Sequence, residues 1–390
     1  MSVVTTSDYG PGPSLFRGGP FYRIQLATRV IKQTGWNHTR RVILAVLITW
    51  VPLVLLTAFF NFAGLISLLT DYRVYSRLLI AVPVLLLGQP FMESRFRMVV
   101  KAVIDARLLG SDDLKRMDGI IASLVRLRDS FIPEGMVVIL VVAHTIVGFK
   151  AEVDVTPWLA RGVPPDLHLT AAGWYAVIGS ATIFQFLMGI SLWKWLLWTI
   201  FAFRLSQLDL KLVPTHPDRH GGLGFLGLVP VGFTPVSFAA ATAIGATWRH
   251  DILAHGAKLT GFNLQAIVLT AIIAIVALGP LAFFVLRLTR LRYQGILDYG
   301  VLGLIQGTDF HQKWIQQRAG HEGEFLTAPE CSSLADFGSA AATVAGLQPF
   351  PADRGALIAL AFSIAVPLSP VVLSVIPLSV VLKDLFEAMR

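Results

Sequence analysis

Long uncharged stretches constrain this chain more than any other feature of its sequence. Five of them exceed 20 residues without a charge, at 42–70, 167–193, 221–248, 259–286 and 355–382. Crossing the hydrocarbon core of a bilayer, about 30 Å thick, takes about 20 apolar residues in a helix. Two shorter stretches, 78–92 and 135–149, reach that length if the helix tilts or its flanking residues extend toward the headgroups. We therefore predict an all-α polytopic integral membrane protein.

Seven transmembrane spans are predicted, at 43–66, 77–97, 131–150, 170–193, 224–247, 263–287 and 355–380. The last span contains Pro367, Pro370 and Pro377. Because proline interrupts the hydrogen bonding of a helix, a broken or re-entrant hairpin is the alternative for this segment.

The composition excludes other classes of protein. Only 14% of the residues are charged, compared with about 25% in ordinary soluble domains, and the mean hydropathy is +0.67. So little charge cannot cover a water-exposed surface of this size, which argues against a soluble enzyme, a disordered protein and a nucleic-acid-binding module. The single cysteine, Cys331, excludes an internal disulfide.

The distribution of basic residues predicts the orientation. Segments 1–41, 93–134, 194–219 and 287–354 together carry 24 Lys and Arg residues, whereas 71–77, 150–166, 249–258 and 383–390 carry eight. Loops rich in Lys and Arg stay in the cytoplasm. The N-terminus is therefore predicted inside and the C-terminus outside, and the net charge of +8 reflects this topology. No signal-peptide pattern precedes residue 42, so we expect the first span to be an uncleaved anchor.

This topology divides the chain into five regions. They are a cytoplasmic N-terminal segment (1–41), a first three-span half (42–150) with a cytoplasmic helical insertion (94–130), a periplasmic loop and connector span (151–203), a cytoplasmic loop (204–223), and a second three-span half (224–390) with a cytoplasmic helical insertion (288–353). In the insertions, Ser111 is expected to cap a helix over 114–127. Further helices are expected over 288–314 and after Ser332, on either side of a polar loop at 319–330. These helices form either a packed cytoplasmic layer or separate amphipathic helices on the membrane surface.

Landmarks at matched spacing indicate that the first half is duplicated in the second. Three pairs share their order and spacing: Pro52 with Pro230, Gly88 with Gly279, and Pro133 with Pro351. Spans one to three and five to seven would then be parallel repeats joined by span four, a 3+1+3 plan related to that of known transporters. Convergent placement of helix breakers is the alternative.

The densest polar cluster lies at the cytoplasmic mouth of span five, in the sequence PTHPDRHGGLGFLG at 214–227. His216, Asp218 and His220 are residue types that bind metals, and they are weak candidates for a metal site. Pro214 and Pro217 argue against a helix that would align the two histidines. No Lys-Ser/Thr pair follows the glycines and no strand precedes them, so a phosphate-binding P-loop and a dinucleotide site are excluded.

We expect this segment to form a tight loop. Asp218 would cap the helix of span five, and Gly221 and Gly222 would allow close packing. Arg219 should find a carboxylate or carbonyl partner on the inner helices. The alternative is a gating or ligand-contacting loop in which His216, Asp218, Arg219, Gly221 and Gly222 act directly.

Two polar residues within predicted spans, Gln89 and His144, are further candidates, because polar groups at membrane depth are expensive. Gln89 precedes Pro90, and its pairing with the corresponding Gly279 and Pro280 points to a central ligand or gating site. His144 falls in the middle of span three, where it could contact a ligand or form a hydrogen bond to a neighbouring helix. Lys194 is expected to extend its ammonium group to the lipid headgroups.

The loop also carries a resemblance. Residues 215–227 resemble bacterial multi-pass inner-membrane proteins of unknown activity that share the pattern T-H-P-D-R-x-G-G-L-G-F-L-G. The resemblance implies a location in the bacterial inner membrane and assigns no activity. Position x, His220 here, is often a small residue in such proteins, which favours His216, Asp218 and Arg219 over His220.

Three functional hypotheses follow. A channel or transporter for a small solute or ion should gather polar groups of spans two, three and six around one cavity. A membrane-embedded enzyme or metal-binding protein should bring His216, Asp218 and Arg219 together with residues 298–336. A signalling or assembly component should expose an apolar patch on its cytoplasmic helices. We favour the first, and predict no cofactor and no nucleic-acid partner; the expected partners are the bilayer and a small solute or ion, with a homo-oligomer left open.

Overall fold

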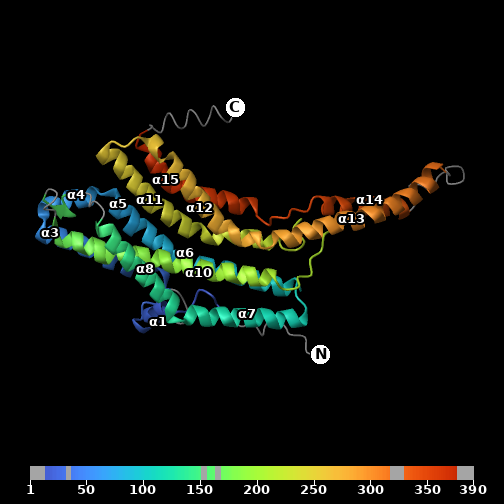
Figure 1. Cartoon of the computed structure of the whole chain (residues 1–390), viewed down its shortest axis with the longest axis horizontal. Coiled ribbons are helices and arrows are strands. Elements are labelled where there is room, and N and C mark those ends of the chain that lie inside the picture. The colour runs from blue at the N-terminus through green and yellow to red at the C-terminus, as the bar shows by residue number, and fades with distance from the viewer. Residues whose placement is uncertain (1–13, 32–36, 151–155, 163–167, 317–328, 376–390) are drawn as a thin grey trace.

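Helices make up nearly all of the regular structure in this computed structural model, which describes residues 14–31, 37–150, 156–162, 168–316 and 329–375 (Figure 1). The helices are α1 (Pro20–Ala27), α2 (His38–Thr49), α3 (Val51–Phe60), α4 (Leu65–Thr70), α5 (Tyr72–Tyr75), α6 (Val82–Asp105), α7 (Ser111–Asp129), α8 (Phe131–Lys150), α9 (Ala171–Tyr175), α10 (Thr182–Ser206), α11 (Thr234–His255), α12 (Asn263–Ala282), α13 (Val285–Phe310), α14 (Pro329–Ala345) and α15 (Arg354–Leu373). Shorter 3₁₀ or π-helical turns are η1 (Phe62–Gly64), η2 (Ser76–Ala81), η3 (Ala176–Ala181), η4 (Gly224–Leu228), η5 (Pro230–Phe233), η6 (Leu259–Phe262) and η7 (His311–Gln316). Two short strands, β1 (Ala160–Arg161) and β2 (His168–Leu169), pair antiparallel.

Among the residues that the structure describes, six helical runs are long and apolar enough to cross a membrane. They are His38–Phe60, Tyr72–Asp105, Ala171–Ser206, Gly224–His255, Leu259–Ala282 and Arg354–Leu373. The remaining predicted span corresponds to α8, which joins α7 at a bend of 46° and becomes the seventh candidate if the bent pair counts as one span. The chain is thus a multi-pass helical membrane protein.

Three of these runs are longer than the predicted spans. Tyr72–Asp105, Ala171–Ser206 and Gly224–His255 hold 34, 36 and 32 residues, whereas about 20 suffice for the bilayer core. About a dozen residues of each run must therefore stand outside the hydrocarbon. The extended end of α10 packs on α7, where Arg204 Nη1 donates to Ser123 Oγ at 2.7 Å. The helix α7 of the insertion 94–130 thus packs against the end of α10.

Two helix boundaries differ from the predictions. The first span ends at Phe60 rather than at residue 66, because Asn61 leaves the helical conformation and its Nδ2 donates to the carbonyl of Pro157 at 2.6 Å. The helix predicted over 114–127 already begins at Ser111, so Gly110 and not Ser111 occupies the capping position. Asp112 and Asp113 instead lie in the first turn, where negative charge complements the helix dipole.

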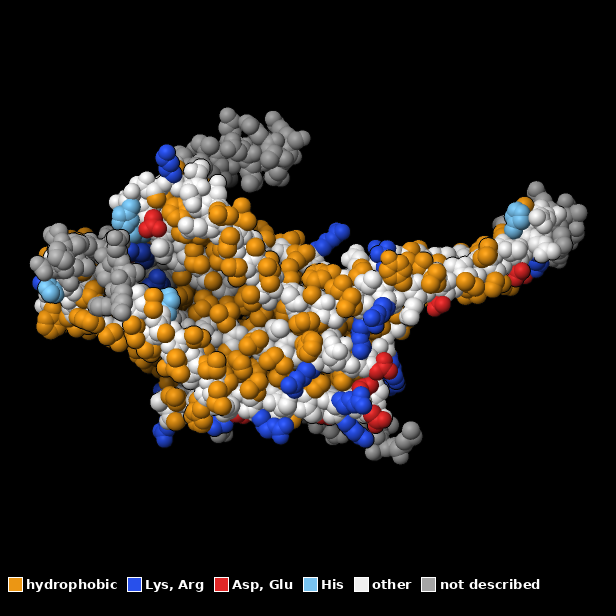
Figure 2. Space-filling model, in the orientation of Figure 1, with side chains coloured by type: hydrophobic (Ala, Val, Ile, Leu, Met, Phe, Trp, Pro, Cys, Tyr) orange, Lys and Arg blue, Asp and Glu red, His pale blue; other side chains and the backbone are white. Residues whose placement is uncertain are grey.

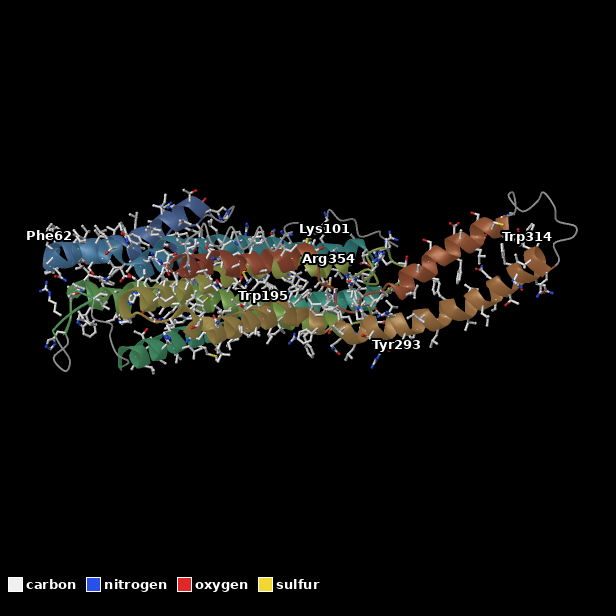
Figure 3. The ribbon with its side chains drawn as sticks, turned by 90° about the horizontal axis from the view of Figure 1, so that it is seen from above. Phe62, Lys101, Trp195, Tyr293, Trp314 and Arg354 are labelled. Carbon is white, nitrogen blue, oxygen red and sulfur yellow. The ribbon has the colours of Figure 1, made fainter. Side chains whose placement is uncertain are left out.

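The second insertion forms a long arm. α13 continues away from the body after α12, and α14 returns beside it, so the two helices project together beyond every other element (Figures 1 and 3). Trp314 lies near the tip of the arm, whereas Phe62 lies at the opposite end of the molecule (Figure 3). The prediction of a helix over 288–314 is confirmed, and the helix expected after Ser332 begins earlier, at Pro329. The predicted polar loop at 319–330 lies mostly outside the described residues.

The last candidate span is one uninterrupted helix from Arg354 to Leu373, through Pro367 and Pro370. The hairpin alternative is therefore wrong for this part of the segment, and Pro377 lies outside the described residues. α15 packs along α11, where Ser237 Oγ and Ser363 Oγ are 2.6 Å apart and Gly245 lies against the backbone of Pro367. Small residues at this contact let the helix backbones approach closely.

α11 is the most enclosed span: 56% of its apolar stretch is buried, compared with 17–44% in the other five. The main core lies between α6, α10 and α11, and includes the fully buried Phe96, Trp198 and Phe201. On the face in view in Figure 2, hydrophobic side chains cover much of the body, while Lys and Arg gather along its lower edge and near the base of the arm. This surface suits lipid contact in the middle of the molecule and water at the charged edge.

The landmark pairs of the predicted duplication fall in different local structures. Pro52 lies at the start of α3 and Pro230 at the start of a 3₁₀ turn. Gly88 packs against Pro235, whereas Gly279 has open space beside it. The 3+1+3 repeat stays a prediction.

Candidate functional site

The loop between α10 and η4 folds back on itself. Pro214 and Pro217 prevent a helix, and the backbone instead forms turns: Val213 N donates to Gly221 O at 3.2 Å and Arg219 N donates to His216 O at 3.0 Å. The loop is anchored to the neighbouring insertion by Lys211 N, which donates to Leu108 O at 2.8 Å. This segment, residues 211–223, is called the loop below.

Three loop residues have left-handed backbone conformations: Arg219 (φ 57°), Gly221 (φ 64°) and Gly222 (φ 97°). Glycine adopts this region at little cost, whereas a side chain is strained there. A Cβ atom at Gly221 would also lie 2.7 Å from Leu291 Cδ2, so this glycine allows α13 to approach. Arg219 is thus held in a costly conformation by the turns around it, a kind of strain that often accompanies function.

Asp218 organises the loop through its carboxylate. Oδ1 accepts from His220 N at 2.8 Å and Gly222 N at 3.1 Å, and Oδ2 accepts from Gly224 N at 2.8 Å, at the start of η4. His216 Nδ1 lies 2.9 Å from Oδ1. Partial burial by itself would raise the pKa of Asp218, but the three N–H groups and His216 outweigh it and lower the pKa below its usual value. Asp218 therefore stays ionised and caps the entry to α11.

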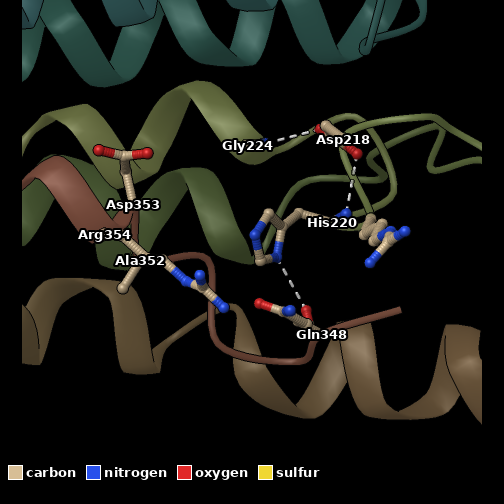
Figure 4. Close-up of a pocket in the computed structure, with 8 residues that line it drawn as sticks. Asp218, His220, Gly224, Gln348, Ala352, Asp353 and Arg354 are labelled. Atoms are coloured by element: carbon tan, nitrogen blue, oxygen red, sulfur yellow. Dashed lines mark hydrogen bonds between the residues drawn. The ribbon is translucent and has the colours of Figure 1, made fainter. Parts of the chain in front are cut away.

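A pocket of about 540 Å³ lies between the loop, the start of η4 and the link that precedes α15 (Figure 4). It is lined by Asp218, Arg219, His220, Gly224, Gln348, Ala352, Asp353 and Arg354. Gln348 joins the two sides, because its N–H donates to Arg219 O at 2.7 Å and its carbonyl lies 2.9 Å from His220 Nδ1. Asp353 caps α15 by accepting from Ala356 N at 3.0 Å. The pocket thus connects the entries of two spans that pack along each other.

The two loop histidines point to different partners. His216 contacts Asp218, whereas His220 contacts Gln348. Within the described ranges, no group of three His, Cys, Asp or Glu side chains is arranged to hold a metal ion. In the described part of the chain, the loop meets residues 348–354 and not the carboxylates of 298–316 and 329–336, of which Asp309 lines a separate pocket on the arm.

A second polar site surrounds residues 14–25, which we call the inserted segment. Leu15 and Phe16 are buried in the main core. Glu93 of α6 accepts from Ser14 Oγ and from Phe16 N, the latter at 3.3 Å. Lys194 of α10 donates to Phe16 O at 2.9 Å.

Charged groups of three further helices complete this site. Arg128 of α7 donates to Ser14 O, and the neighbouring Asp129 accepts from Gly19 N at 2.9 Å. Glu134 of α8 accepts from Phe21 N at 2.6 Å. Arg41 of α2 bridges Gln25 Oε1 and Gln89 Oε1, each at 2.8 Å. We call the side chains of Arg41, Gln89, Glu93, Arg128, Glu134 and Lys194 the buried polar cluster.

Sequence reasoning missed most of this cluster. Lys194 is 3% exposed and binds Phe16, so the expectation that it reaches the headgroups is wrong. Glu93 and Arg41 lie at predicted span ends, where charge is ordinary, and no local signal marks them as buried. Their hydrogen-bond partners lie in residues 14–25, which the sequence analysis placed in a polar N-terminal segment outside the membrane.

The other predicted candidates lie apart from the loop pocket. Gln89 is buried in the polar cluster, and α6 continues as a helix through Pro90, so no break opens there. His144 is exposed on α8. The structure thus brings together His216, Asp218, Arg219, Gly221 and Gly222, but not Gln89 or His144.

Long apolar helices that run past the bilayer, with charged groups held among them, define a multi-pass helical membrane protein. Comparison with protein-family profiles, with curated proteins and with solved structures finds no match to this chain.

Proposed function

We propose that the protein is a channel or transporter for a small solute or ion in the bacterial inner membrane, with its N-terminus in the cytoplasm. The observation that carries this proposal is the buried polar cluster, in which charged side chains of five helices point to one interior region. Ionisable groups inside a membrane protein are expensive and typically mark a solute or ion pathway. The cluster draws on spans one to four, so it includes spans two and three, as the sequence suggested, but not span six.

The inserted segment would close this pathway. Glu93, Lys194, Glu134 and Arg128 each form a hydrogen bond with a backbone group of the segment. Glu93 also pairs with Arg97, and Arg128 with Asp129. If the segment withdrew, these charges would line a water-filled space. The inserted segment would therefore act as a gate, and its withdrawal would open a hydrophilic path.

The loop would couple the gate to the cytoplasmic layer. Asp218 holds the entry of α11, and Arg219 is joined through its backbone to the link before α15. Asp218→Asn and Arg219→Gln are expected to insert and fold but to lose regulated flux. Full flux in both variants would reduce the loop to a packing element.

Flux measurements in proteoliposomes test the proposal. A chain that starts at Gly19 lacks Ser14 and Phe16, and it should conduct small ions faster than the full chain. A chain that starts at Ser14 is the matched control, because it keeps every described contact of the inserted segment. No flux above empty liposomes for any of the three chains, across small cations and anions, would contradict the proposal. Should the shorter chain fail to fold, Lys194→Gln in the full chain must change the ion selectivity.

An assembly role is the second candidate function. Tyr299 of α13 stacks on Phe337 of α14, with ring centroids 5.9 Å apart, so α14 covers one face of α13. The opposite face exposes four apolar side chains, 63–73% accessible, at spacings of four, four and three: Tyr293, Leu297, Val301 and Leu304. This spacing is typical of a helix–helix seam.

A second copy of the chain, anchored in the same membrane, would present the same stripe in parallel. In a Cys331→Ser background, Leu297→Cys should form a disulfide between two copies on oxidation. Ala335→Cys, on the exposed face of α14, is the control and should not. Equal cross-linking at both positions would contradict a specific seam.

A further inference from the structure

The loop pocket has unused hydrogen-bond donors. Its guanidinium groups, on Arg219 and Arg354, make no hydrogen bond or ion pair with any residue that the structure describes. The carboxylates of the pocket are engaged: Asp218 accepts from three backbone N–H groups, and Asp353 accepts from Ala356 N. The Asp218 carboxylate is therefore occupied by the loop itself, whereas both guanidinium groups keep free hydrogen-bond capacity.

The backbone positions of both arginines are fixed. Arg219 is held in its left-handed conformation, and its carbonyl accepts from Gln348 N at 2.7 Å. Arg354 is the first residue of α15, directly after the capping residue Asp353. The backbone carbonyl of Gln348 also contacts Nδ1 of the His220 ring (Figure 4). Because a carbonyl can only accept a hydrogen bond, Nδ1 of His220 carries the proton. Two exposed cationic side chains thus line one cavity from firmly placed backbone.

The surroundings favour negative charge in the same place. The pocket lies at the N-terminus of α15, a helix of 20 residues, where the backbone dipoles present partial positive charge. A guanidinium group binds two oxygens of a carboxylate or a phosphate side by side. The cavity of about 540 Å³ is in the range of small-molecule sites and larger than a lone phosphate needs.

We infer that the loop pocket binds a small anion through a phosphate or carboxylate group, held between Arg219 and Arg354. The bound anion would bridge the entries of α11 and α15. Binding does not depend on transport, so this inference stands or fails separately from the proposed function.

Thermal unfolding and calorimetric titration with inorganic phosphate test the inference. The protein is purified without phosphate in maltoside micelles, which contain no anionic headgroup. Phosphate should raise the unfolding midpoint of the wild type and of Arg126→Gln, an exposed arginine on α7 that serves as the matched control. Arg219→Gln and Arg354→Gln should each weaken binding about tenfold, as expected when a charge-assisted hydrogen bond is lost. Arg354→Lys should weaken binding less, because lysine keeps the positive charge and loses only the paired N–H donors of the guanidinium group.

A lipid headgroup and a free anion offer the same chemistry, and nanodiscs distinguish them. If phosphatidylglycerol nanodiscs weaken phosphate binding relative to phosphatidylcholine nanodiscs, the site takes a lipid headgroup; if they do not, it takes a soluble anion. Unchanged unfolding midpoints with phosphate and with phosphatidylglycerol would overturn the inference. So would equal phosphate binding by the wild type and both Gln variants.

Discussion

At the scale of single residues, Asp218 links the chemistry of the loop to the entry of a span. Its carboxylate accepts three backbone N–H groups that would otherwise be left without partners. Replacing it with Asn keeps one acceptor oxygen and removes the charge. We expect Asp218→Asn to cost about 1–2 kcal/mol of stability, the usual value of a helix cap. Asp112→Asn, an exposed side chain on α7 with only a 3.8 Å contact to Lys115, should change the unfolding midpoint little.

The pH dependence of this effect has a definite sign. The folded-state pKa of Asp218 is lowered, so its contribution is complete above the ordinary aspartate pKa of about 4. It is lost only as the pH falls through the lowered folded-state pKa. The difference in unfolding midpoint between wild type and Asp218→Asn should therefore be constant from neutral pH down to about 5 and shrink only in stronger acid. A difference that vanishes near neutral pH would show that Asp218 is not held as a charged cap.

Two glycines should respond to alanine in opposite ways. Gly222 has a φ of 97°, which strains any side chain, so Gly222→Ala should destabilise the protein by about 1–3 kcal/mol. Gly119 lies on an exposed face of α7 with nothing within 4 Å of its missing Cβ. Gly119→Ala should stabilise by up to about 1 kcal/mol because alanine favours helix. Thermal unfolding of both variants measures the difference, and a destabilised Gly119→Ala would contradict the helical account.

At the scale of elements, the long helices serve both the membrane and the layer outside it. α10 belongs to a run of 36 residues, so its C-terminal part, which packs on α7, should stand in water. In a Cys331→Ser background, Phe203→Cys should react with a membrane-impermeant maleimide in inverted vesicles. Ile178→Cys, which is 60% exposed and lies earlier in the same run, should be protected by lipid. Equal labelling at both positions would contradict the expectation that the C-terminal part of α10 lies outside the bilayer.

At the scale of the whole molecule, the topology can be tested against a contact. Lys211 N donates to Leu108 O, so Ser111 and Thr215 must lie on the same side of the membrane. Single cysteines at these positions should both label from the cytoplasm. Ala254→Cys, at the other end of α11, should label from outside. Labelling of Ala254 from the cytoplasm would contradict the positive-inside orientation.

Much of the fold could be predicted from the sequence, because insertion into a bilayer depends on the apolar character of short continuous segments. An apolar run of about 20 residues must satisfy its own backbone hydrogen bonds, and only a helix does so within one segment. The helical nature, the approximate places of the spans and the tight loop at Pro214 and Pro217 follow from such local rules. The cap by Asp218 follows too, because its partners lie within six residues.

Only the tertiary structure decided which distant groups meet. Lys194 binds the carbonyl of Phe16, 178 positions away, and His220 meets the carbonyl of Gln348, 128 positions away. Neither partner carries a local signal, because every residue has a backbone carbonyl and its availability depends on how the helices pack. The sequence therefore determined that this chain crosses a membrane and where it turns. The packing of the helices determined which charges lie buried, what they hold, and that Arg219 and Arg354 share one pocket.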